Sequence, residues 1–232
     1  STVENVNGKA PVFYGKSEKN QCGKENCIYA TEIRNLGLDG MKAVFHFPEC
    51  TKEVEIPIPG EHNVLNALAG ACVGMELGLD VEQICAGIKK AQTIGGRTNL
   101  IHANDMLIID DCYNANPISM KASIDVLNMA IGRKVAVLGN MGELGDTAEA
   151  LHAEVGTYAA EQNVDLVCGI GDLTRSLVEE ASKGANTEAL WFADNESFIQ
   201  AIPDIIKDGD NVLVKASHGM NFPQIVHALE EL

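Results

Sequence analysis

Two different patterns of apolar positions divide the chain. The first 58 residues contain short runs in which β-branched and aromatic residues are frequent, separated by NG, LG, DG and PEC breaks: PVFY, CIYATEIRNL, MKAVFHF and KEVEIPI. Such runs between turn residues are typical of strands. From Pro59 the apolar residues recur at helical spacing, and Asp80 is placed to cap a second helix, VEQICAGIKKAQ. The pattern predicts a β-rich start followed by two helices.

After Gly95 and Gly96 the pattern changes to short apolar runs that alternate with amphipathic segments. The runs are MLIID, KVAVLG, VDLVCGIG, ALWFA and NVLVKA, and the helices are expected near 118–131, 147–162, 173–183, 195–207 and 221–231. Strands without a polar face need cover on both sides, which crossover helices give to a parallel sheet. We predict an α/β chain in which a Rossmann-like parallel-sheet domain, residues 96–232, follows a β-rich and helical segment, residues 1–95.

Residues 10–17, APVFYGKS, match the loose pattern of a phosphate-binding loop. A working loop joins a buried strand to a helix, and its glycines let backbone N–H groups converge on phosphates. Here the variable positions are Pro, Val, Phe and Tyr, which favour a strand. The next segment, EKNQCGKENC, has no apolar face for a helix to bury. We therefore predict a strand that ends in a Gly-Lys turn.

Charge and composition exclude some partners. The chain has 232 residues, with 33 acidic and 17 basic side chains and a formal net charge of -16. This charge disfavours nucleic acid and anionic membranes as partners. The longest apolar helical stretch, residues 64–79, is interrupted by polar residues and glycines, so we expect no membrane insertion.

Seven cysteines and six histidines show no spacing typical of a metal site. Cys22 and Cys27 are the only close pair of cysteines, and they lack CxxC spacing. Reduced thiols in a cytosolic protein are the simplest interpretation.

Three stretches carry candidate chemistry, and the first is GEHNVLNA at the start of the first long helix. Asn63 and Asn66 are three residues apart, so both can face one side of the first turn. A carboxamide offers the donor and the acceptor that an adenine edge requires. The alternative is that Asn63 caps the helix and Asn66 is an ordinary polar position.

The second stretch is IIDDCYNANPISM, residues 108–120, where an apolar strand ends in two carboxylates and Pro117 opens the next helix. Ligands of open α/β sheets gather at the carboxyl ends of strands, and an acid there can accept hydrogen bonds from ribose hydroxyls. The alternative is that one acid and the asparagines only shape a turn. The candidate residues are Asp110, Asp111, Tyr113, Asn114 and Asn116.

The third stretch is a pair of strand ends, VLGNMGELGD and VLVKASHGM. The glycines of the first permit a close approach to a ligand, while Lys215 and Ser217 of the second supply a cation and a hydroxyl suited to a carboxylate. Lys215 could equally be a surface charge, and each glycine a turn residue.

Taken together, GEHNVLNALAG, DDCYNANPISM, VLGNMGELG followed by His152, and VLVKASHGM resemble the Mur ligase family over about residues 28–232. The resemblance implies a cytoplasmic, ATP-dependent ligase, expected as a monomer, with UDP-N-acetylmuramoyl-tripeptide and D-alanyl-D-alanine as substrates. It implies phosphorylation of the tripeptide carboxylate to an acyl phosphate, with Mg²⁺, and attack by the dipeptide amine.

The resemblance also implies that residues 1–95 are the last part of a central ATP-binding domain and that residues 96–232 bind the dipeptide. The first domain, the phosphate loop and the metal ligands would lie upstream, so the chain alone is expected to be inactive. The family usually carries Asp in place of Asn140 and Arg in place of His218.

Carried over by motif, the implied roles fall into three groups. The ATP-binding group contains Asn63 and Asn66 on the adenine side, Asp111 as the ribose acid, and Tyr113 and Asn114 at the junction. Arg97 is the catalytic arginine that reaches the phosphates, and the substrate-binding residues are Asn116, Lys215 and Ser217. No metal ligand is assigned within the chain.

Two other functions compete with this one. A sibling ligase or a folylpolyglutamate ligase would use the same chemistry with another acceptor, and DDCYNANP argues against both. A nucleotide-binding module without catalysis is the other alternative. Submillimolar affinity of this chain alone for ATP, measured by calorimetry, would favour the module.

Overall fold

The computed structural model describes residue 5, residues 8–16 and residues 27–232. The chain divides into two compact units, Ser1–Gln92 (unit 1) and Thr93–Leu232 (unit 2). The division falls close to Gly95 and Gly96, where the sequence pattern changes. Each unit has its own sheet and its own hydrophobic core.

Unit 1 contains a four-stranded sheet in the order β1-β2-β3-β4. Its strands are β1 (Phe13–Gly15), β2 (Cys27–Asn35), β3 (Met41–His46) and β4 (Thr51–Ile56). β1 runs parallel to β2, and the other pairs are antiparallel. The predicted strand at PVFY is confirmed over β1, after which Lys16 pairs with Glu61 at 2.7 Å. Ser17, the last residue of the phosphate-loop pattern, lies outside the described residues.

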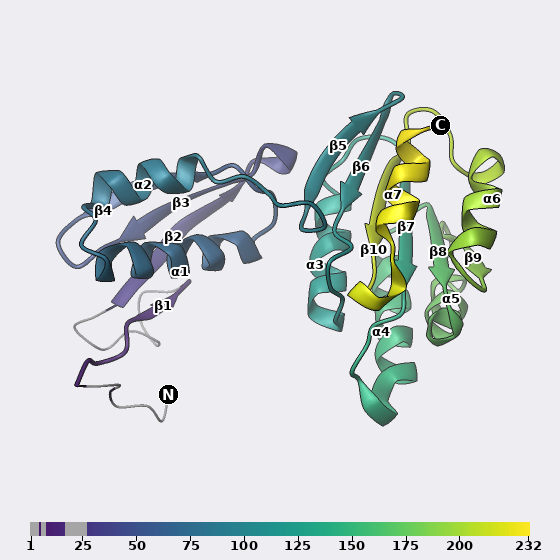
Figure 1. The fold of residues 1–232 in the computed structure, drawn as a ribbon, viewed down its shortest axis with the longest axis horizontal. Coiled ribbons are helices and arrows are strands. Elements are labelled where there is room, and N and C mark those ends of the chain that lie inside the picture. The colour runs from purple at the N-terminus through teal and green to yellow at the C-terminus, as the bar shows by residue number, and fades with distance from the viewer. Residues whose placement is uncertain (1–4, 6–7, 17–26) are drawn as a thin grey trace. The chain divides into compact units, whose positions relative to one another are not determined.

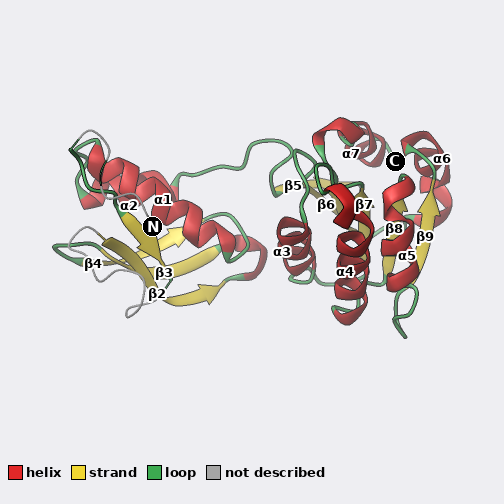
Figure 2. Ribbon diagram, turned by 90° about the horizontal axis from the view of Figure 1, so that it is seen from below, coloured by secondary structure: helices red, strands yellow, loops and turns green. Residues whose placement is uncertain are grey.

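Two helices, α1 (His62–Glu76) and α2 (Val81–Lys89), cover one face of this sheet (Figures 1 and 2). Alternate residues of β3, such as Ala43 and Phe45, are buried together with Leu68 of α1. Asp80 caps α2 as predicted: its side chain accepts a hydrogen bond from the Gln83 N–H, and the Gln83 side chain accepts one in return. The helical spacing of the sequence therefore identified the layer that buries the sheet.

One prediction about the cysteines is wrong. Cys27 is disulfide-bonded, whereas the other described cysteines are free thiols: Cys50, Cys72, Cys85, Cys112 and Cys168. The missing CxxC spacing argued against a metal site, but a disulfide needs only two Cβ atoms within bonding reach.

Unit 2 contains a six-stranded sheet in the order β5-β6-β10-β7-β8-β9. Its strands are β5 (Asn99–Ala103), β6 (Met106–Asp110), β7 (Lys134–Gly139), β8 (Leu166–Ile170), β9 (Glu188–Phe192) and β10 (Asn211–Lys215). All five predicted apolar runs form parallel strands. β5 was not predicted and runs antiparallel to β6. The two strands are joined at Asn104 and Asp105, which have φ of 48° and 59°.

Helices cover both faces of this sheet, as the strands without a polar face predicted. They are α3 (Pro117–Leu127), α4 (Ala148–Glu161), α5 (Arg175–Ala181), α6 (Asn195–Ile205) and α7 (Pro223–Glu230). α3, α4 and α5 pack together on one face, and α6 and α7 pack together on the other (Figure 2). The carboxyl ends of β6, β10 and β7 therefore meet at one edge, which places the candidate residues that follow these strands.

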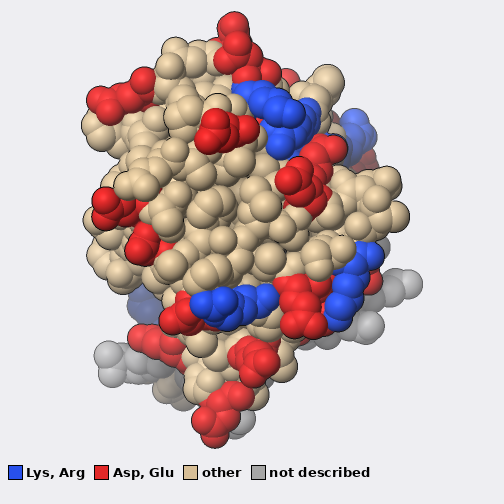
Figure 3. All heavy atoms as spheres, turned by 90° about the vertical axis from the view of Figure 1, so that its right-hand side faces the viewer, with Lys and Arg blue, Asp and Glu red and all other residues tan. Residues whose placement is uncertain are grey.

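The surface of unit 2 carries both signs of charge. On the face drawn in Figure 3, Asp and Glu side chains are spread over the surface, with Lys and Arg side chains between them. Within the described residues, we find no helix with both the length and the apolar character needed to span a bilayer.

Contact between α4 and α5 depends on Gly156. A Cβ atom at this position would lie 2.0 Å from the Leu177 carbonyl oxygen. We expect Gly156→Ala to lower the free energy of unfolding of unit 2 by about 1–3 kcal/mol, because the helices must separate. Trp191 is the only tryptophan and lies in unit 2, so its fluorescence during urea denaturation reports this unit. Gly219→Ala, which meets nothing within 4 Å, is the matched control, and an equal loss in both variants would contradict the prediction.

Candidate functional site

In unit 1, the two asparagines at the start of α1 contact each other. The Asn63 amide nitrogen donates to the Pro59 carbonyl at 2.8 Å, and its oxygen accepts a hydrogen bond from Asn66 at 2.9 Å. The N-cap position belongs to Glu61, so Asn63 is not the cap. Asn63 is buried and Asn66 is exposed. Asn63 thus holds Asn66, whose carbonyl oxygen and second N–H are not used in any described hydrogen bond.

Both asparagines line a pocket of 360 Å³ within unit 1. Its other lining residues are mostly apolar and come from β4, α1 and α2 and from the segments beside them, among them Ile56, Ile58, Ala67, Leu79, Ile84 and Ile88. An apolar hollow with a few fixed polar groups is typical of small-molecule sites. One donor and one acceptor at its margin are the groups that a flat heteroaromatic base requires. The pocket therefore fits the predicted adenine side.

In unit 2, Asp110 ends β6 and is buried. One of its carboxylate oxygens accepts from the Gly96 N–H at 2.7 Å, and the other from the Cys112 thiol at 2.9 Å. Burial, together with the hydrogen bond to Asp110 and its charge, raises the pKa of Cys112 to about 12. The thiol therefore stays protonated and acts as a donor.

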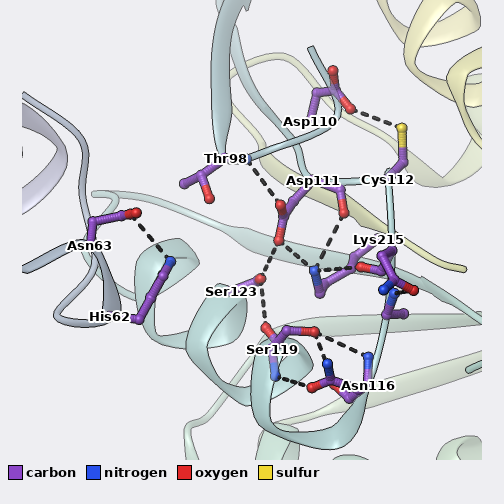
Figure 4. A network of polar contacts seen from close by, with 12 residues as sticks. His62, Asn63, Thr98, Asp110, Asp111, Cys112, Asn116, Ser119, Ser123 and Lys215 are labelled. Atoms are coloured by element: carbon purple, nitrogen blue, oxygen red, sulfur yellow. Dashed lines mark hydrogen bonds and ion pairs between the residues drawn. The ribbon is translucent and has the colours of Figure 1, made fainter. Parts of the chain in front are cut away.

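Asp111 is the centre of a second set of contacts (Figure 4). Its carboxylate accepts from the Thr98 N–H at 3.0 Å, the Ser123 hydroxyl at 2.5 Å and the Lys215 ammonium at 2.6 Å. Its side chain is 13% exposed. The structure thus gives Asp111 internal partners, and its role as a ribose acid stays a prediction.

Lys215, at the end of β10, points inward. Its side chain is 3% exposed, and the ammonium contacts the Asp111 carboxylate, the Asp111 carbonyl at 3.4 Å and the Asn114 carbonyl at 3.0 Å. An ammonium has three donors, so these contacts can use all of them. The geometry makes Lys215 a support for the loop after β6. The predicted contact with the dipeptide stays a prediction.

The asparagines of the loop shape the chain locally. Asn116 caps α3, where its oxygen accepts from the Ser119 N–H at 2.8 Å, and Pro117 follows in the first turn. The Asn114 oxygen accepts from the Ala115 N–H at 2.8 Å. Both residues are nevertheless exposed. The turn-forming alternative describes their observed contacts, and their predicted ligand contacts stay predictions.

Arg97 lies beside two rings at the same sheet edge. Its guanidinium is 4.2 Å from the centre of the Tyr113 ring, and the Tyr113 ring is 5.6 Å from the His218 ring. All three residues are exposed. A guanidinium over an aromatic face is held by the ring quadrupole and keeps its donors outward. Unit 2 thus presents a cation at the ends of β6 and β10.

Ser217 joins the ends of β10 and β7. Its hydroxyl accepts from the Gly142 N–H at 2.8 Å, and its own N–H donates to the Asn140 carbonyl at 3.1 Å. The Asn140 side chain lies against Gly171, where a Cβ atom would approach it to 2.8 Å. Ser217 is therefore a link within the site, and its predicted contact with substrate stays a prediction.

His152 secures the loop after β7, a contact that the sequence did not predict. It is fully buried on α4, and its Nε2 accepts a hydrogen bond from the Met141 N–H at 2.9 Å. Nδ1 therefore carries the proton and donates a hydrogen bond to the Ala148 carbonyl at 2.6 Å. Burial lowers the pKa of His152 below 6.5, against the opposing effect of the Ala148 hydrogen bond. The folded state therefore favours neutral imidazole.

A pH dependence follows from this histidine. Because its folded-state pKa is lowered, its contribution to stability is present above pH 6.5 and is lost as pH falls through the folded-state pKa. We expect the free energy of unfolding of unit 2 to fall by up to about 1.4 kcal/mol per pH unit in this window. In His152→Gln, whose amide keeps one donor and one acceptor, this part of the slope should vanish.

Urea denaturation at several pH values, followed by Trp191 fluorescence, measures this slope. His227→Gln is the control because His227 is exposed on α7. An unchanged slope in His152→Gln would contradict the prediction.

Within the described residues, no group of three or more His, Cys, Asp or Glu side chains could hold a metal ion. The part of the chain that the structure describes therefore does not fit a Mg²⁺ centre.

Comparison with known proteins assigns the family. A family model described as "Mur ligase, glutamate ligase domain" matches residues 96–218. The chain is also 37% identical over 222 residues to a protein of Bacillus subtilis, UDP-N-acetylmuramoyl-tripeptide--D-alanyl-D-alanine ligase. That alignment covers 94% of this chain and 47% of the relative. The chain belongs to the Mur ligase family.

Solved structures agree with this assignment to the Mur ligases. MurF from Acinetobacter baumannii superposes with a TM-score of 0.79 at 32% identity, covering 88% of this chain and 45% of that one. MurF ligase from Thermotoga maritima, solved in complex with ADP, gives a TM-score of 0.72 at 25% identity over 89% of this chain and 48% of that one. The chain thus spans less than half the length of the Mur ligases that it matches.

Proposed function

We propose that this chain is part of an ATP-dependent amide-bond ligase that adds D-alanyl-D-alanine to UDP-N-acetylmuramoyl-tripeptide in peptidoglycan precursor synthesis. The observation that carries the proposal is the 37% identity to a ligase of that name, which extends over 94% of the chain. Residues 1–95 would belong to the ATP-binding domain and residues 96–232 to the domain that binds the dipeptide. The enzyme would be cytoplasmic and monomeric.

In this proposal, unit 1 binds the nucleoside end of ATP. Asn66, held by Asn63, would hydrogen-bond the adenine edge while the apolar walls of the 360 Å³ pocket exclude water. The ADP complex of the Thermotoga maritima relative supports ATP as the nucleotide. Mg²⁺ would be held by residues outside the described part of this chain.

Unit 2 would supply a cation to the transferring phosphate. ATP would phosphorylate the tripeptide carboxylate to an acyl phosphate, which the dipeptide amine would attack through a tetrahedral intermediate with release of phosphate. Charge that develops on the phosphoryl oxygens is stabilised by preorganised donors. Arg97 is the exposed cation at the sheet edge, and its guanidinium is already ordered over Tyr113. Ser217 and Asn116 lie at the same edge, where the dipeptide would bind.

Acceptor selection tests the proposal. Phosphate release and product formation by the intact ligase should require UDP-N-acetylmuramoyl-tripeptide together with D-alanyl-D-alanine. Earlier precursors offered with single amino acids should give neither. Faster product formation with a single amino acid would indicate a sibling ligase. Absence of phosphate release with every acceptor would favour a nucleotide-binding module.

A further inference from the structure

Arg97 lies between two residues whose backbone N–H groups are held by adjacent carboxylates. Gly96 donates to Asp110 at 2.7 Å, and Thr98 donates to Asp111 at 3.0 Å. The Gly96 carbonyl in turn accepts from the Tyr113 N–H at 2.9 Å. The segment on both sides of Arg97 is therefore attached to the end of β6, and all of these contacts lie within unit 2.

The backbone at this point has a conformation that the sequence alone would not favour. Gly96 and Thr98 have φ of 80° and 48°, in the left-handed region. For a β-branched residue such as Thr98 this is a rare conformation that surrounding contacts must maintain. Gly96 has little room for a side chain, because a Cβ atom would lie 3.2 Å from the Cβ and the backbone nitrogen of Tyr113. Hydrogen bonds to charged acceptors on both sides of Arg97 supply the required support.

The two acids are themselves fixed by buried partners. Cys112 donates to the second oxygen of Asp110, while Ser123 and Lys215 donate to Asp111 (Figure 4). Asp110 is 8% exposed, and the Asp111 side chain is 13% exposed. Their carboxylates therefore face the segment around Arg97 and the inside of unit 2.

We propose that Asp110 is a positioning residue that holds the segment around Arg97 against the end of β6, as a rigid part of unit 2. Asp110 acts on turnover through Arg97 and not by contact with the nucleotide. This inference rests on the proposed function only for the role of Arg97. A guanidinium whose backbone and ring contacts are already fixed needs no further ordering when it reaches a phosphate.

Hydrogen exchange measures the attachment without reference to catalysis. In the intact ligase, mass spectrometry of peptides covering residues 93–100 should show exchange accelerated by about tenfold or more in Asp110→Ala, because the Gly96 N–H loses a charged acceptor. Asp110→Asn keeps an acceptor oxygen, so its exchange rate should increase less. This variant keeps the test valid if the alanine variant does not fold. Asp105→Asn makes the same charge change in the exposed turn before β6 and should change nothing. Unchanged exchange in both Asp110 variants would overturn the proposal.

Kinetics then test whether Asp110 acts through Arg97. Asp110→Asn should lower kcat with KM for ATP unchanged, and in an Arg97→Ala background it should lower kcat no further. A raised KM for ATP in that background would mean that Asp110 contacts the nucleotide, and would overturn the inference. Normal kcat in Arg97→Ala alone would instead remove the role proposed for Arg97, while the exchange result would still stand.

Discussion

Replacing Arg97 with alanine in the intact ligase is expected to lower kcat by about 100- to 1000-fold, the usual loss when one preorganised donor to a developing oxyanion is removed. The reason is that Arg97 is an exposed cation whose guanidinium is held 4.2 Å from the Tyr113 ring and directed away from the core. Its charge would be needed more in the transition state than in the ground state, so KM for ATP should change much less than kcat. Steady-state phosphate release at saturating ATP measures both constants.

The same substitution should leave folding nearly unchanged. An exposed cation–π contact contributes only about 0.5–1 kcal/mol, so urea denaturation followed by Trp191 fluorescence should move little. Arg34→Ala, which removes an exposed arginine of β2 paired with Glu32, is the control for loss of charge and should keep normal turnover. Normal turnover of Arg97→Ala at saturating ATP would contradict the assignment.

Most of the secondary structure could be predicted because each element buries one continuous apolar pattern. The five apolar runs of unit 2 became parallel strands because β6, β7, β8 and β10 are covered on both faces, which leaves no polar periodicity to misinterpret. Capping signals were equally local: Asp80 and Asn116 both accept the hydrogen bond that defines a helix start. Local chemistry of this kind does not depend on the rest of the fold.

β5 escaped prediction because its pattern is mixed. Its five residues are only partly buried or exposed, as expected at the edge of a sheet, so no clear alternation marks it. The turn that joins it to β6 was the available signal. Asn104 and Asp105 both have positive φ, and Asn and Asp adopt that conformation more easily than other non-glycine residues. The two turn-forming residues between NLIHA and MLIID are therefore the signal from which a hairpin could have been predicted.

The candidate residues could be predicted more readily than their contacts. Motif spacing and the rule for strand ends selected Asp111, Lys215 and Ser217 as candidates, and the structure brings the Lys215 ammonium to the Asp111 carboxylate. Their mutual contacts depend on which side chains the fold brings within 3 Å. Ser123 and His152 illustrate the limit, since each lies on a helix and looks in the sequence like an ordinary position. A buried polar residue becomes recognisable only when its partner is known.

Replacing Lys215 is expected to cost unit 2 a large part of its stability. We expect Lys215→Met to lower the free energy of unfolding by about 3–5 kcal/mol, the usual cost of breaking a buried ion pair from one side. Methionine preserves most of the aliphatic volume, so the loss comes from the Asp111 carboxylate, which stays buried without its cation. Two carbonyl groups, of Asp111 and Asn114, would lose a donor as well.

Lys89→Met is the matched control, because Lys89 pairs with Glu55 at 2.7 Å but is 69% exposed. Exposed pairs contribute at most about 1 kcal/mol, so this variant should unfold almost normally. Urea denaturation followed by far-UV circular dichroism covers both units, and Trp191 fluorescence isolates unit 2. The result also separates two roles for Lys215. If the ammonium served chiefly to bind the dipeptide carboxylate, Lys215→Met would unfold normally while the intact ligase showed a raised KM for D-alanyl-D-alanine. Its burial, and contacts sufficient for all three donors, lead us to expect the loss of stability instead.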